Sequence, residues 1–189
     1  MDEAQAYLLA AGKGKRAGGP KAWIAHEDGT LLGRQVAFLT GLFAPGAVAV
    51  TVQEAWLERC RGVDPGVRWV PVDPGASPLH ALQAALKAAP LTKWGCLHHV
   101  DMPVWEGTLF RDLLTRAREA DEAGVEAIIP VHDGKGGHPV LLSPRLGEAL
   151  LALDPDKDRL DRFLRGRFAR RVEVSYPCVL ENWNAGRPR

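Results

Sequence analysis

The sequence has few cysteines and no long apolar segment. Its three cysteines, Cys60, Cys96 and Cys178, are odd in number, widely spaced and never arranged as Cys-x-x-Cys, a pattern that fits neither a disulfide framework nor a structural zinc site. No run approaches the ~20 apolar residues that a membrane span needs. The first residues, Met1–Gln5, lack the basic region of a signal peptide. We therefore expect a cytoplasmic protein that binds no membrane.

The chain also lacks an excess of charge of either sign. Its 24 basic and 23 acidic residues leave a formal net charge of +1, so no global field would hold nucleic acid, and any basic site must be local. The 189 residues are 46% hydrophobic, which is enough for a sizeable core. No linker or repeat interrupts them, so we expect a single domain over residues 1–189.

Short apolar runs rich in β-branched residues alternate with longer amphipathic stretches. This alternation is typical of crossover helices that join parallel strands, so the sequence predicts an α/β fold with a mostly parallel central sheet flanked by helices. The expected strands are Ala6–Ala10, Ala47–Val52, Arg68–Val72, Gly95–Val100, Val125–Val131, Val140–Leu142, Arg171–Val174 and Cys178–Leu180. The expected helices are Leu31–Phe43, Ala55–Arg61, Leu79–Ala89, Thr108–Ala123, Pro144–Leu153 and Lys157–Arg165.

A basic, glycine-rich loop follows the first expected strand and reads LAAGKGKRAGGPK from Leu9 to Lys21. Glycines let the backbone approach a ligand closely, and successive N–H groups in such a turn form an anion-binding nest. The cations of this loop could neutralise a triphosphate. They are Lys13, Lys15, Arg16 and Lys21. The alternative is a flexible, solvated basic loop without a ligand.

Two common phosphate-binding motifs do not fit this loop. The dinucleotide fingerprint G-x-G-x-x-G fails because Ala17 stands at the third glycine position. The motif G-x-x-x-x-G-K-[ST] fails because Pro20 separates Gly19 from Lys21, and Ala22 replaces the hydroxyl that would hold Mg²⁺. The spacing therefore disfavours both a nicotinamide dinucleotide site and an ATPase of that type.

The loop resembles the signature of the MobA-like NTP transferases, a family that includes molybdenum-cofactor cytidylyl- and guanylyltransferases. Sugar-phosphate nucleotidyltransferases have a related loop. The resemblance implies a Rossmann-like nucleotidyltransferase fold in which the loop wraps the triphosphate of an NTP. It implies catalytic roles for Arg16 and Lys21 in stabilising charge on the phosphates. The nucleotide-binding residues that it implies in this loop are Leu9, Ala10, Ala11, Gly12, Lys13, Gly14, Arg16 and Lys21.

An acidic turn, Asp101-Met102-Pro103, follows the expected strand that ends at Val100. Ligands of open α/β sheets bind beyond the carboxyl ends of the strands, and Mg²⁺ is commonly held by one or two carboxylates together with substrate phosphates. The resembling family carries an Asp-x-Pro turn here, which implies that Asp101 binds Mg²⁺ and takes part in catalysis. The alternative is an aspartate that only caps a turn.

The adjacent His98 and His99 raise the question of a zinc site. Zinc needs three or four convergent ligands, and neighbouring side chains on a strand point to opposite faces of the sheet. We therefore interpret at least one of these histidines as a packed residue rather than a ligand.

Two later segments give weaker signals. Ser77 stands where a helix N-cap belongs, and the resemblance implies that it also contacts the base or ribose; neither role excludes the other. The segment Gly137-His138-Pro139-Val140 is similar to one in the cytidylyltransferase branch, which implies that His138 lies near the acceptor pocket.

The end of the chain departs from the family pattern. Members usually close with an Asn/Asp-Thr-Pro-Glu-Asp sequence that supplies a second metal ligand, whereas this chain has Asn182-Trp183-Asn184 and then Ala185. Asn184 matches that ligand best, with Asn182 as the alternative. An amide oxygen can coordinate Mg²⁺ but adds no charge, so reduced activity or an altered acceptor is an open alternative.

Together, these features predict a Mg²⁺-dependent enzyme that transfers a nucleoside monophosphate from an NTP to a small phosphorylated acceptor such as molybdopterin. A protein that delivers the acceptor, or a molybdoenzyme, would be its partner. In the resembling family the cytidylyl branch tends to carry Leu-Ala-Ala-Gly and the guanylyl branch Leu-Ala-Gly-Gly, so Ala11 implies CTP rather than GTP; the physical reason would be that its methyl group crowds a purine. Gly14 and Gly18-Gly19, by contrast, resemble the guanylyl branch. The alternatives are a sugar-phosphate nucleotidyltransferase and a noncatalytic nucleotide-binding domain.

Overall fold

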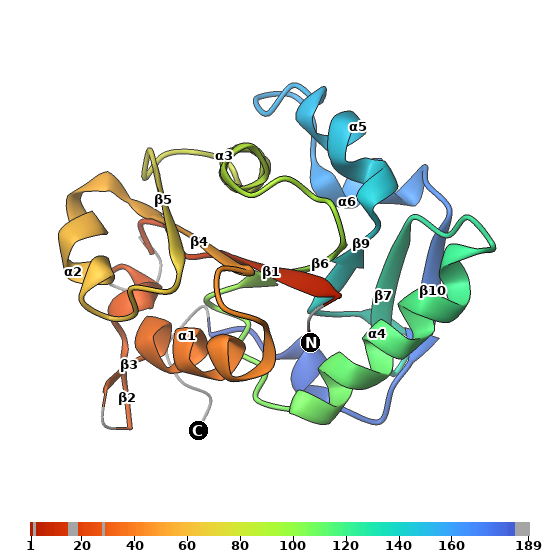
Figure 1. Ribbon diagram of the computed structural model, residues 1–189, viewed down its shortest axis with the longest axis horizontal. Coiled ribbons are helices and arrows are strands. Elements are labelled where there is room, and N and C mark those ends of the chain that lie inside the picture. The colour runs from red at the N-terminus through yellow and green to blue at the C-terminus, as the bar shows by residue number, and fades with distance from the viewer. Residues whose placement is uncertain (2, 15–18, 28, 184–189) are drawn as a thin grey trace.

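The computed structural model of the protein describes residues 1, 3–14, 19–27 and 29–183 (Figure 1). The strands are β1 (Ala4–Leu9), β2 (Ala25–His26), β3 (Gly29–Thr30), β4 (Val48–Gln53), β5 (Arg68–Val72), β6 (Trp94–His99), β7 (Ala127–His132), β8 (Lys135–Gly136), β9 (Val140–Leu142) and β10 (Ala169–Glu173). The α-helices are α1 (Leu31–Leu42), α2 (Leu57–Arg61), α3 (Pro78–Ala88), α4 (Gly107–Asp121), α5 (Gly147–Leu151) and α6 (Leu160–Arg165). The short 3-10 helices are η2 (Lys21–Trp23), η3 (Glu54–Trp56), η4 (Pro144–Leu146) and η5 (Pro177–Leu180).

A mixed, mostly parallel sheet lies at the centre of the fold. Its strands run in the order β10-β7-β9-β6-β1-β4-β5, and β8 pairs with β7 beside this path. The strand β9 is antiparallel to both of its neighbours, β6 and β7, whereas β1 is parallel to both β4 and β6. The predicted α/β fold with a mostly parallel sheet is confirmed.

The strand order reverses beside β1. The chain passes from β1 to β4 and β5 on one side and then returns to β6 on the other side. Connections that leave two neighbouring parallel strands in opposite directions open a crevice at the carboxyl ends of those strands. The loops that follow β1 and β6 therefore flank the place where an open α/β sheet binds its ligand.

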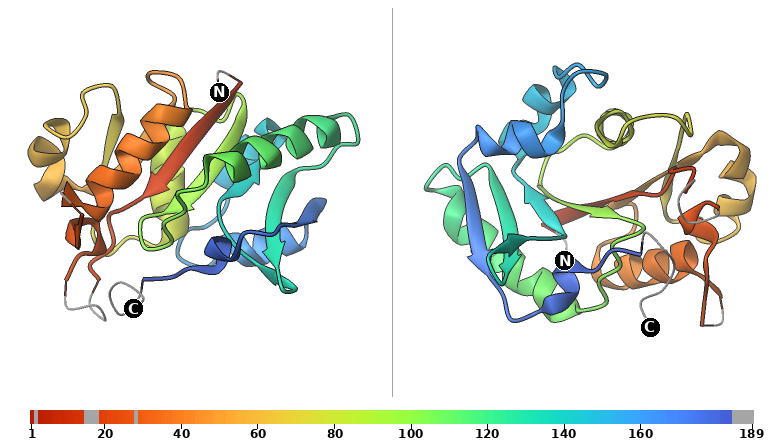
Figure 2. Two further views of the ribbon diagram at one scale, coloured as in Figure 1. Left: turned by 90° about the horizontal axis from the view of Figure 1, so that it is seen from below. Right: turned by 180° about the vertical axis from the view of Figure 1, so that it is seen from behind.

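Helices cover both faces of the sheet (Figures 1 and 2). On one face lie α1 and α4, and on the other lie α3, α5 and α6. Each face has its own core cluster, and β1 contributes to both: Leu8 packs with α1 and α4, and Tyr7 packs with α3. A strand buried on both faces needs apolar side chains at nearly every position, which explains the continuous apolar run in the sequence.

Two capped helix starts fix the elements beside the crevice. The Thr30 hydroxyl accepts a hydrogen bond from the Gly33 N–H at the start of α1, at 3.1 Å. The Ser77 hydroxyl accepts one from the His80 N–H at the start of α3, also at 3.1 Å, and Pro78 occupies the first turn. Such caps satisfy backbone donors that a helix leaves unpaired, and each contributes about 1 kcal/mol.

The structure differs from the sequence prediction in several short elements. The predicted strand at Cys178–Leu180 is wrong: these residues belong to η5, where the Val179 N–H bonds to the Tyr176 carbonyl. The helix predicted from Lys157 begins only at Leu160, because the preceding residues form a tight turn. The hairpin of β2 and β3 was not predicted, because two-residue strands carry no period. Within the described ranges, no helix is long and apolar enough to cross a membrane.

Candidate active site

The glycine-rich loop begins at the carboxyl end of β1, and its described residues Gly14 and Gly19 lie next to each other. The Gly19 N–H bonds to the Gly14 carbonyl at 3.2 Å, and Gly14 has φ of +60°. A Cβ atom at Gly14 would lie 1.8 Å from the Gly19 carbonyl oxygen, so only glycine fits this turn. The described parts of the loop, residues 10–14 and 19–21, therefore come together at the crevice beside β1.

The start of this loop is held by the neighbouring strand β4. The Gln53 side chain donates from Nε2 to the Ala11 carbonyl at 2.9 Å, and the Ala10 N–H bonds to the Thr51 carbonyl at 3.0 Å. Sequence reasoning missed Gln53. Its position as the last residue of a parallel strand, at the edge where ligands bind, was the available signal.

Lys21 and Asp101, 80 residues apart in the sequence, form an ion pair in the crevice. The Lys21 Nζ donates to Asp101 Oδ2 at 2.6 Å, and the two side chains are only 14% and 24% exposed. Lys21 opens η2 directly after Pro20, and Asp101 follows β6 by two residues. Lys21 and Asp101, which lie in different loops and were both predicted to be catalytic, thus come together in the structure.

Two backbone contacts fix the Asp101 turn. The buried Gln35 of α1 donates from Nε2 to the Val100 carbonyl at 2.6 Å, and the Trp183 N–H donates to the Asp101 carbonyl at 2.7 Å. The Trp183 ring packs edge-on against His26, with ring centroids 5.4 Å apart. The C-terminal segment therefore runs to the crevice and is anchored there by an aromatic contact.

A small cavity of about 210 Å³ opens between the two loops. It is lined by the loop residues Ala11, Gly12 and Gly14, and by the pair Lys21 and Asp101. The loop backbone, one ammonium group and one carboxylate therefore face the space between the carboxyl ends of β1 and β6. This chemistry suits a phosphate chain.

A larger cavity of about 850 Å³ adjoins the small one. The residues that line both cavities are Leu9, Ser77, Pro78 and His99. The larger cavity extends under α6 and over β9, β7 and β10, and His138 lines it. Sequence reasoning missed the arginines around this cavity, which are Arg159, Arg165, Arg167 and Arg171. Their spacing in an arginine-rich stretch was visible, but it did not show that they face one space.

The neighbouring histidines of β6 point to opposite faces of the sheet, as predicted. His98 is buried against Phe110, with ring centroids 6.2 Å apart, and burial lowers its pKa well below the usual value. His99 faces His138 at a centroid distance of 5.0 Å where the two cavities meet. Burial, followed by the effect of His99, lowers the pKa of His138 to about 3, and burial also lowers the pKa of His99. Both side chains facing the cavity are therefore neutral at physiological pH.

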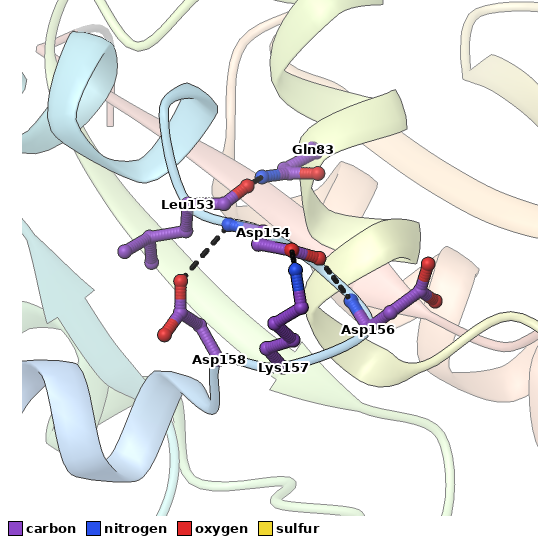
Figure 3. A network of polar contacts seen from close by, with 6 residues as sticks. All are labelled: Gln83, Leu153, Asp154, Asp156, Lys157 and Asp158. Atoms are coloured by element: carbon purple, nitrogen blue, oxygen red, sulfur yellow. Dashed lines mark hydrogen bonds and ion pairs between the residues drawn. The ribbon is translucent and has the colours of Figure 1, made fainter.

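Ser77 caps α3 and also bridges to the wall of the larger cavity. Its hydroxyl donates to the Pro155 carbonyl at 2.9 Å while accepting from the His80 N–H. The same loop is held to α3 by Gln83, which donates to the Leu153 carbonyl at 2.8 Å (Figure 3). Ser77 therefore caps α3, as one of the two interpretations of the sequence predicted, and its hydroxyl group donates its hydrogen bond to another part of the protein.

Most of the predicted site residues lie around the small cavity, but not all. Ala10 is only 1% exposed and supports the loop from behind, and Lys13 is exposed, with Nζ near the Asp73–Gly75 turn. Arg16, the second predicted catalytic cation, and Asn184, the second predicted metal ligand, lie outside the described residues.

The donor set around Asp101 fits a divalent metal only together with a ligand. In the part of the chain that the structure describes, no group of three His, Cys, Asp or Glu side chains is placed to hold a metal ion. Asp101 supplies one hard oxygen donor, and the Lys21 ammonium against it shows that a cation can stand there. A metal at this position would take its remaining ligands from phosphate oxygens and water, as is common for Mg²⁺.

The fold and the adjoining cavities define an α/β protein with a ligand site at the carboxyl ends of its parallel strands. The chain belongs to the MobA-like NTP transferase domain family, which matches residues 6–174. The family resemblance predicted from the glycine-rich loop is therefore confirmed. No curated protein sequence matches the chain.

Several solved structures are similar to this chain. The Rv0371c homologue from Mycobacterium sp. strain JC1 is 26% identical, covers 95% of this chain and 89% of its own, and has a TM-score of 0.77. Rv0371c from Mycobacterium tuberculosis H37Rv, in complex with manganese, is 22% identical over 96% of this chain and 95% of its own, with a TM-score of 0.69. The molybdopterin-guanine dinucleotide biosynthesis protein A from Archaeoglobus fulgidus is 17% identical over 96% and 92%, with a TM-score of 0.71.

Proposed function

We propose that the protein transfers a nucleoside monophosphate from an NTP to a small phosphorylated acceptor and releases pyrophosphate. The observation that carries this proposal is the contact between the two cavities: the smaller one is lined by the glycine-rich loop, Lys21 and Asp101, and the larger one adjoins it at His99. An NTP in the first cavity and an acceptor in the second would meet at that junction. The family membership supports the same reaction class.

In the proposed reaction, an oxygen of the acceptor phosphate attacks the α-phosphorus of the NTP in line with the departing pyrophosphate. One P–O bond forms, the bond to the β-phosphate oxygen breaks, and pyrophosphate leaves as an anion. Transfers of this kind are catalysed mainly by positioning and by neutralising charge. The backbone N–H groups of Gly12 and Gly14 would hold the phosphates, and Lys21 would stabilise the charge that builds on them. Arg16 is proposed for the same role.

We assign Mg²⁺ or a related divalent cation to Asp101, with Asn184 as a second ligand. When bound, the metal supplies positive charge next to the α- and β-phosphates. Trp183, whose N–H bonds to the Asp101 carbonyl, directly precedes Asn184 and supports this assignment. A structure of the mycobacterial Rv0371c protein contains manganese, which supports a divalent metal here.

The neutral histidines have a positioning role in this proposal. An acceptor phosphate is already an anion and needs no base to remove a proton. The uncharged rings of His99 and His138 can bind the acceptor through hydrogen bonds at the junction. Because they carry no positive charge, they do not compete with Lys21 for the phosphates of the NTP. We therefore assign His138 to the acceptor side of the site.

The apolar floor of the larger cavity supports a flat ring compound such as molybdopterin as the proposed acceptor. Its floor is a row of apolar side chains across the sheet, where Leu97 of β6 pairs with Val140 of β9 and Ile129 lies on the next strand. Its described walls are polar, with Asp158, Asp161 and the four arginines, and these groups can bind the phosphate and polar substituents of the acceptor. A volume of about 850 Å³ suits an acceptor of tens of atoms.

For the nucleotide we propose CTP in preference to GTP. Ala11 lines the small cavity, is 7% exposed, and has its carbonyl held by Gln53. A methyl group fixed in this way leaves less room for a purine, and crowding by one methyl group can cost ~1–3 kcal/mol. Side-by-side turnover of the wild type and Ala11→Gly with CTP and GTP tests this: the variant should gain GTP turnover, and unchanged base selectivity would contradict the steric explanation.

Pyrophosphate release is the experiment that tests the proposed reaction. The protein is incubated with each NTP, Mg²⁺ and either molybdopterin or a panel of sugar 1-phosphates. Release that needs molybdopterin and the metal supports the proposal, and release with a sugar 1-phosphate instead would favour the sugar-phosphate alternative. NTP binding without release under any of these conditions would indicate a noncatalytic nucleotide-binding domain.

A further inference from the structure

The ion pair between Lys21 and Asp101 joins two side chains that the proposed function assigns to different partners. Lys21 is assigned to the nucleotide phosphates and Asp101 to the metal, yet the two side chains are in contact with each other at 2.6 Å. Both side chains are largely buried, so water screens the pair less than it screens a surface pair. A divalent cation on Asp101 would stand within a few ångströms of the ammonium, and the two positive charges would repel each other.

How far this repulsion weakens metal binding depends on the other ligands that the protein offers near Asp101. Among the described residues, no cluster of three His, Cys, Asp or Glu side chains could bind a metal without help. The described residues therefore offer a metal on Asp101 few further ligands to offset the displacement of Lys21. A triphosphate adds metal ligands and also offers Lys21 a new partner, since its oxygens both bind metal ions and accept hydrogen bonds from an ammonium group.

We propose that Lys21 and the divalent metal compete for Asp101, and that the triphosphate ends this competition by drawing Lys21 onto its own oxygens. The metal then binds weakly to the free protein and enters the site with the nucleotide. This inference rests on the proposed function. Since coupling between two ligands is reciprocal, the metal and the nucleotide each strengthen the binding of the other.

The test measures binding of Mn²⁺ to the full chain without nucleotide, from the electron paramagnetic resonance signal of the free ion. Lys21→Met should bind Mn²⁺ about three- to tenfold more tightly than the wild type, as expected for removal of a partly buried ion pair. Lys21→Arg retains the positive charge and should bind Mn²⁺ like the wild type. Equal or weaker binding by Lys21→Met would overturn the inference. Circular dichroism checks the fold, and Lys21→Gln replaces the methionine variant if that variant is unfolded.

A second Lys–Asp pair of the same chain provides a matched control. Lys157 donates to Asp154 at 2.7 Å, but this pair lies in the loop before α6, where Lys157 is 82% exposed (Figure 3). Lys157→Met removes the same charge and should leave Mn²⁺ binding unchanged. The double variant Lys21→Met, Asp101→Asn should lose the affinity gained by Lys21→Met, because the competition is for that carboxylate.

Addition of CTP tests the part played by the triphosphate. The factor by which CTP strengthens Mn²⁺ binding should be about three- to tenfold smaller in Lys21→Met than in the wild type, because no lysine has to be displaced in the variant. Equal factors would overturn the inference while the proposed function stands. If Mn²⁺ binds to no variant, even with CTP, the metal site of the proposed function and the inference both fail.

Discussion

Asp101 is the described residue on which the proposed chemistry depends most. Its backbone is fixed by Trp183, and its carboxylate is part of the ion pair rather than of the core. We expect Asp101→Asn to keep the fold but lose the charge that binds the metal, so that metal-dependent turnover falls at least about a hundredfold. Steady-state kinetics at saturating NTP measures this. Asp154→Asn, which breaks an exposed Lys–Asp pair, is the control and should retain turnover. Near-wild-type activity of Asp101→Asn would remove the metal assignment.

His98 is a buried histidine that the proposed chemistry does not use. It is 2% exposed, and neither ring nitrogen has a hydrogen-bond partner among the described residues. Since burial holds its pKa well below 6.5 in the folded state, the unfolded chain takes up a proton below about pH 6.5 and the folded chain does not. This difference lowers the stability of the folded state as the pH falls, and it vanishes above that pH.

We therefore expect His98→Leu to be at least as stable as the wild type at pH 7.5. Below about pH 6.5 its advantage should grow by up to ~1.4 kcal/mol per pH unit, because leucine takes up no proton in either state. Urea unfolding of both proteins between pH 5 and pH 8 measures the difference. A constant difference across that range would show that His98 takes up its proton equally in the folded and unfolded states, so that folding does not lower its pKa.

At the scale of elements, the turn of the glycine-rich loop is the feature that a single methyl group should break. In Gly14→Ala the new Cβ would collide with the Gly19 carbonyl, at a position with φ of +60°. We expect the variant to melt within a few degrees of the wild type, because the loop lies outside the core, and to bind CTP at least about tenfold more weakly. Calorimetric titration with CTP is the measurement. Gly41→Ala in α1, where a Cβ also meets nothing within 4 Å and which lines neither cavity, is the matched control.

The sheet and the glycine-rich loop could be predicted from the sequence for definite reasons. Strands such as β1 are buried on both faces, so their apolar runs are continuous and easily found. By contrast, part of η5 was wrongly predicted as a strand, because a run of three apolar residues is too short for its hydrophobic periodicity to distinguish a strand from a helical turn. The contact of Gln53 with Ala11 joins side chain and backbone across 42 residues, which no local pattern reveals. The loops of Lys21 and Asp101 were both predicted, but their direct pairing was not.

At the scale of the whole molecule, Ser77 links the walls of the two cavities. Its hydroxyl caps α3 beside the small cavity and holds the Pro155 carbonyl in the loop that leads to Asp158 and Arg159 of the larger one. We expect Ser77→Ala to lose about 1 kcal/mol of stability and to raise KM for the acceptor more than KM for the NTP. Ser77→Thr, which keeps a hydroxyl, should restore both. Equal changes in the two KM values would contradict this link to the acceptor side, and a larger change in KM for the NTP would indicate that Ser77 contacts the nucleotide.

The transfer of a labelled α-phosphate from CTP to the acceptor tests the central claim most directly. CTP labelled at the α-phosphorus is incubated with the wild type, Mg²⁺ and molybdopterin, and the products are separated. We predict that the label appears in a cytidylyl–acceptor conjugate, that unlabelled pyrophosphate forms in equal amount, and that Asp101→Asn yields neither. Label recovered only in CTP, CDP or free CMP, with no acceptor conjugate from any NTP, would contradict the assignment of this chain as a nucleotidyltransferase that acts on molybdopterin.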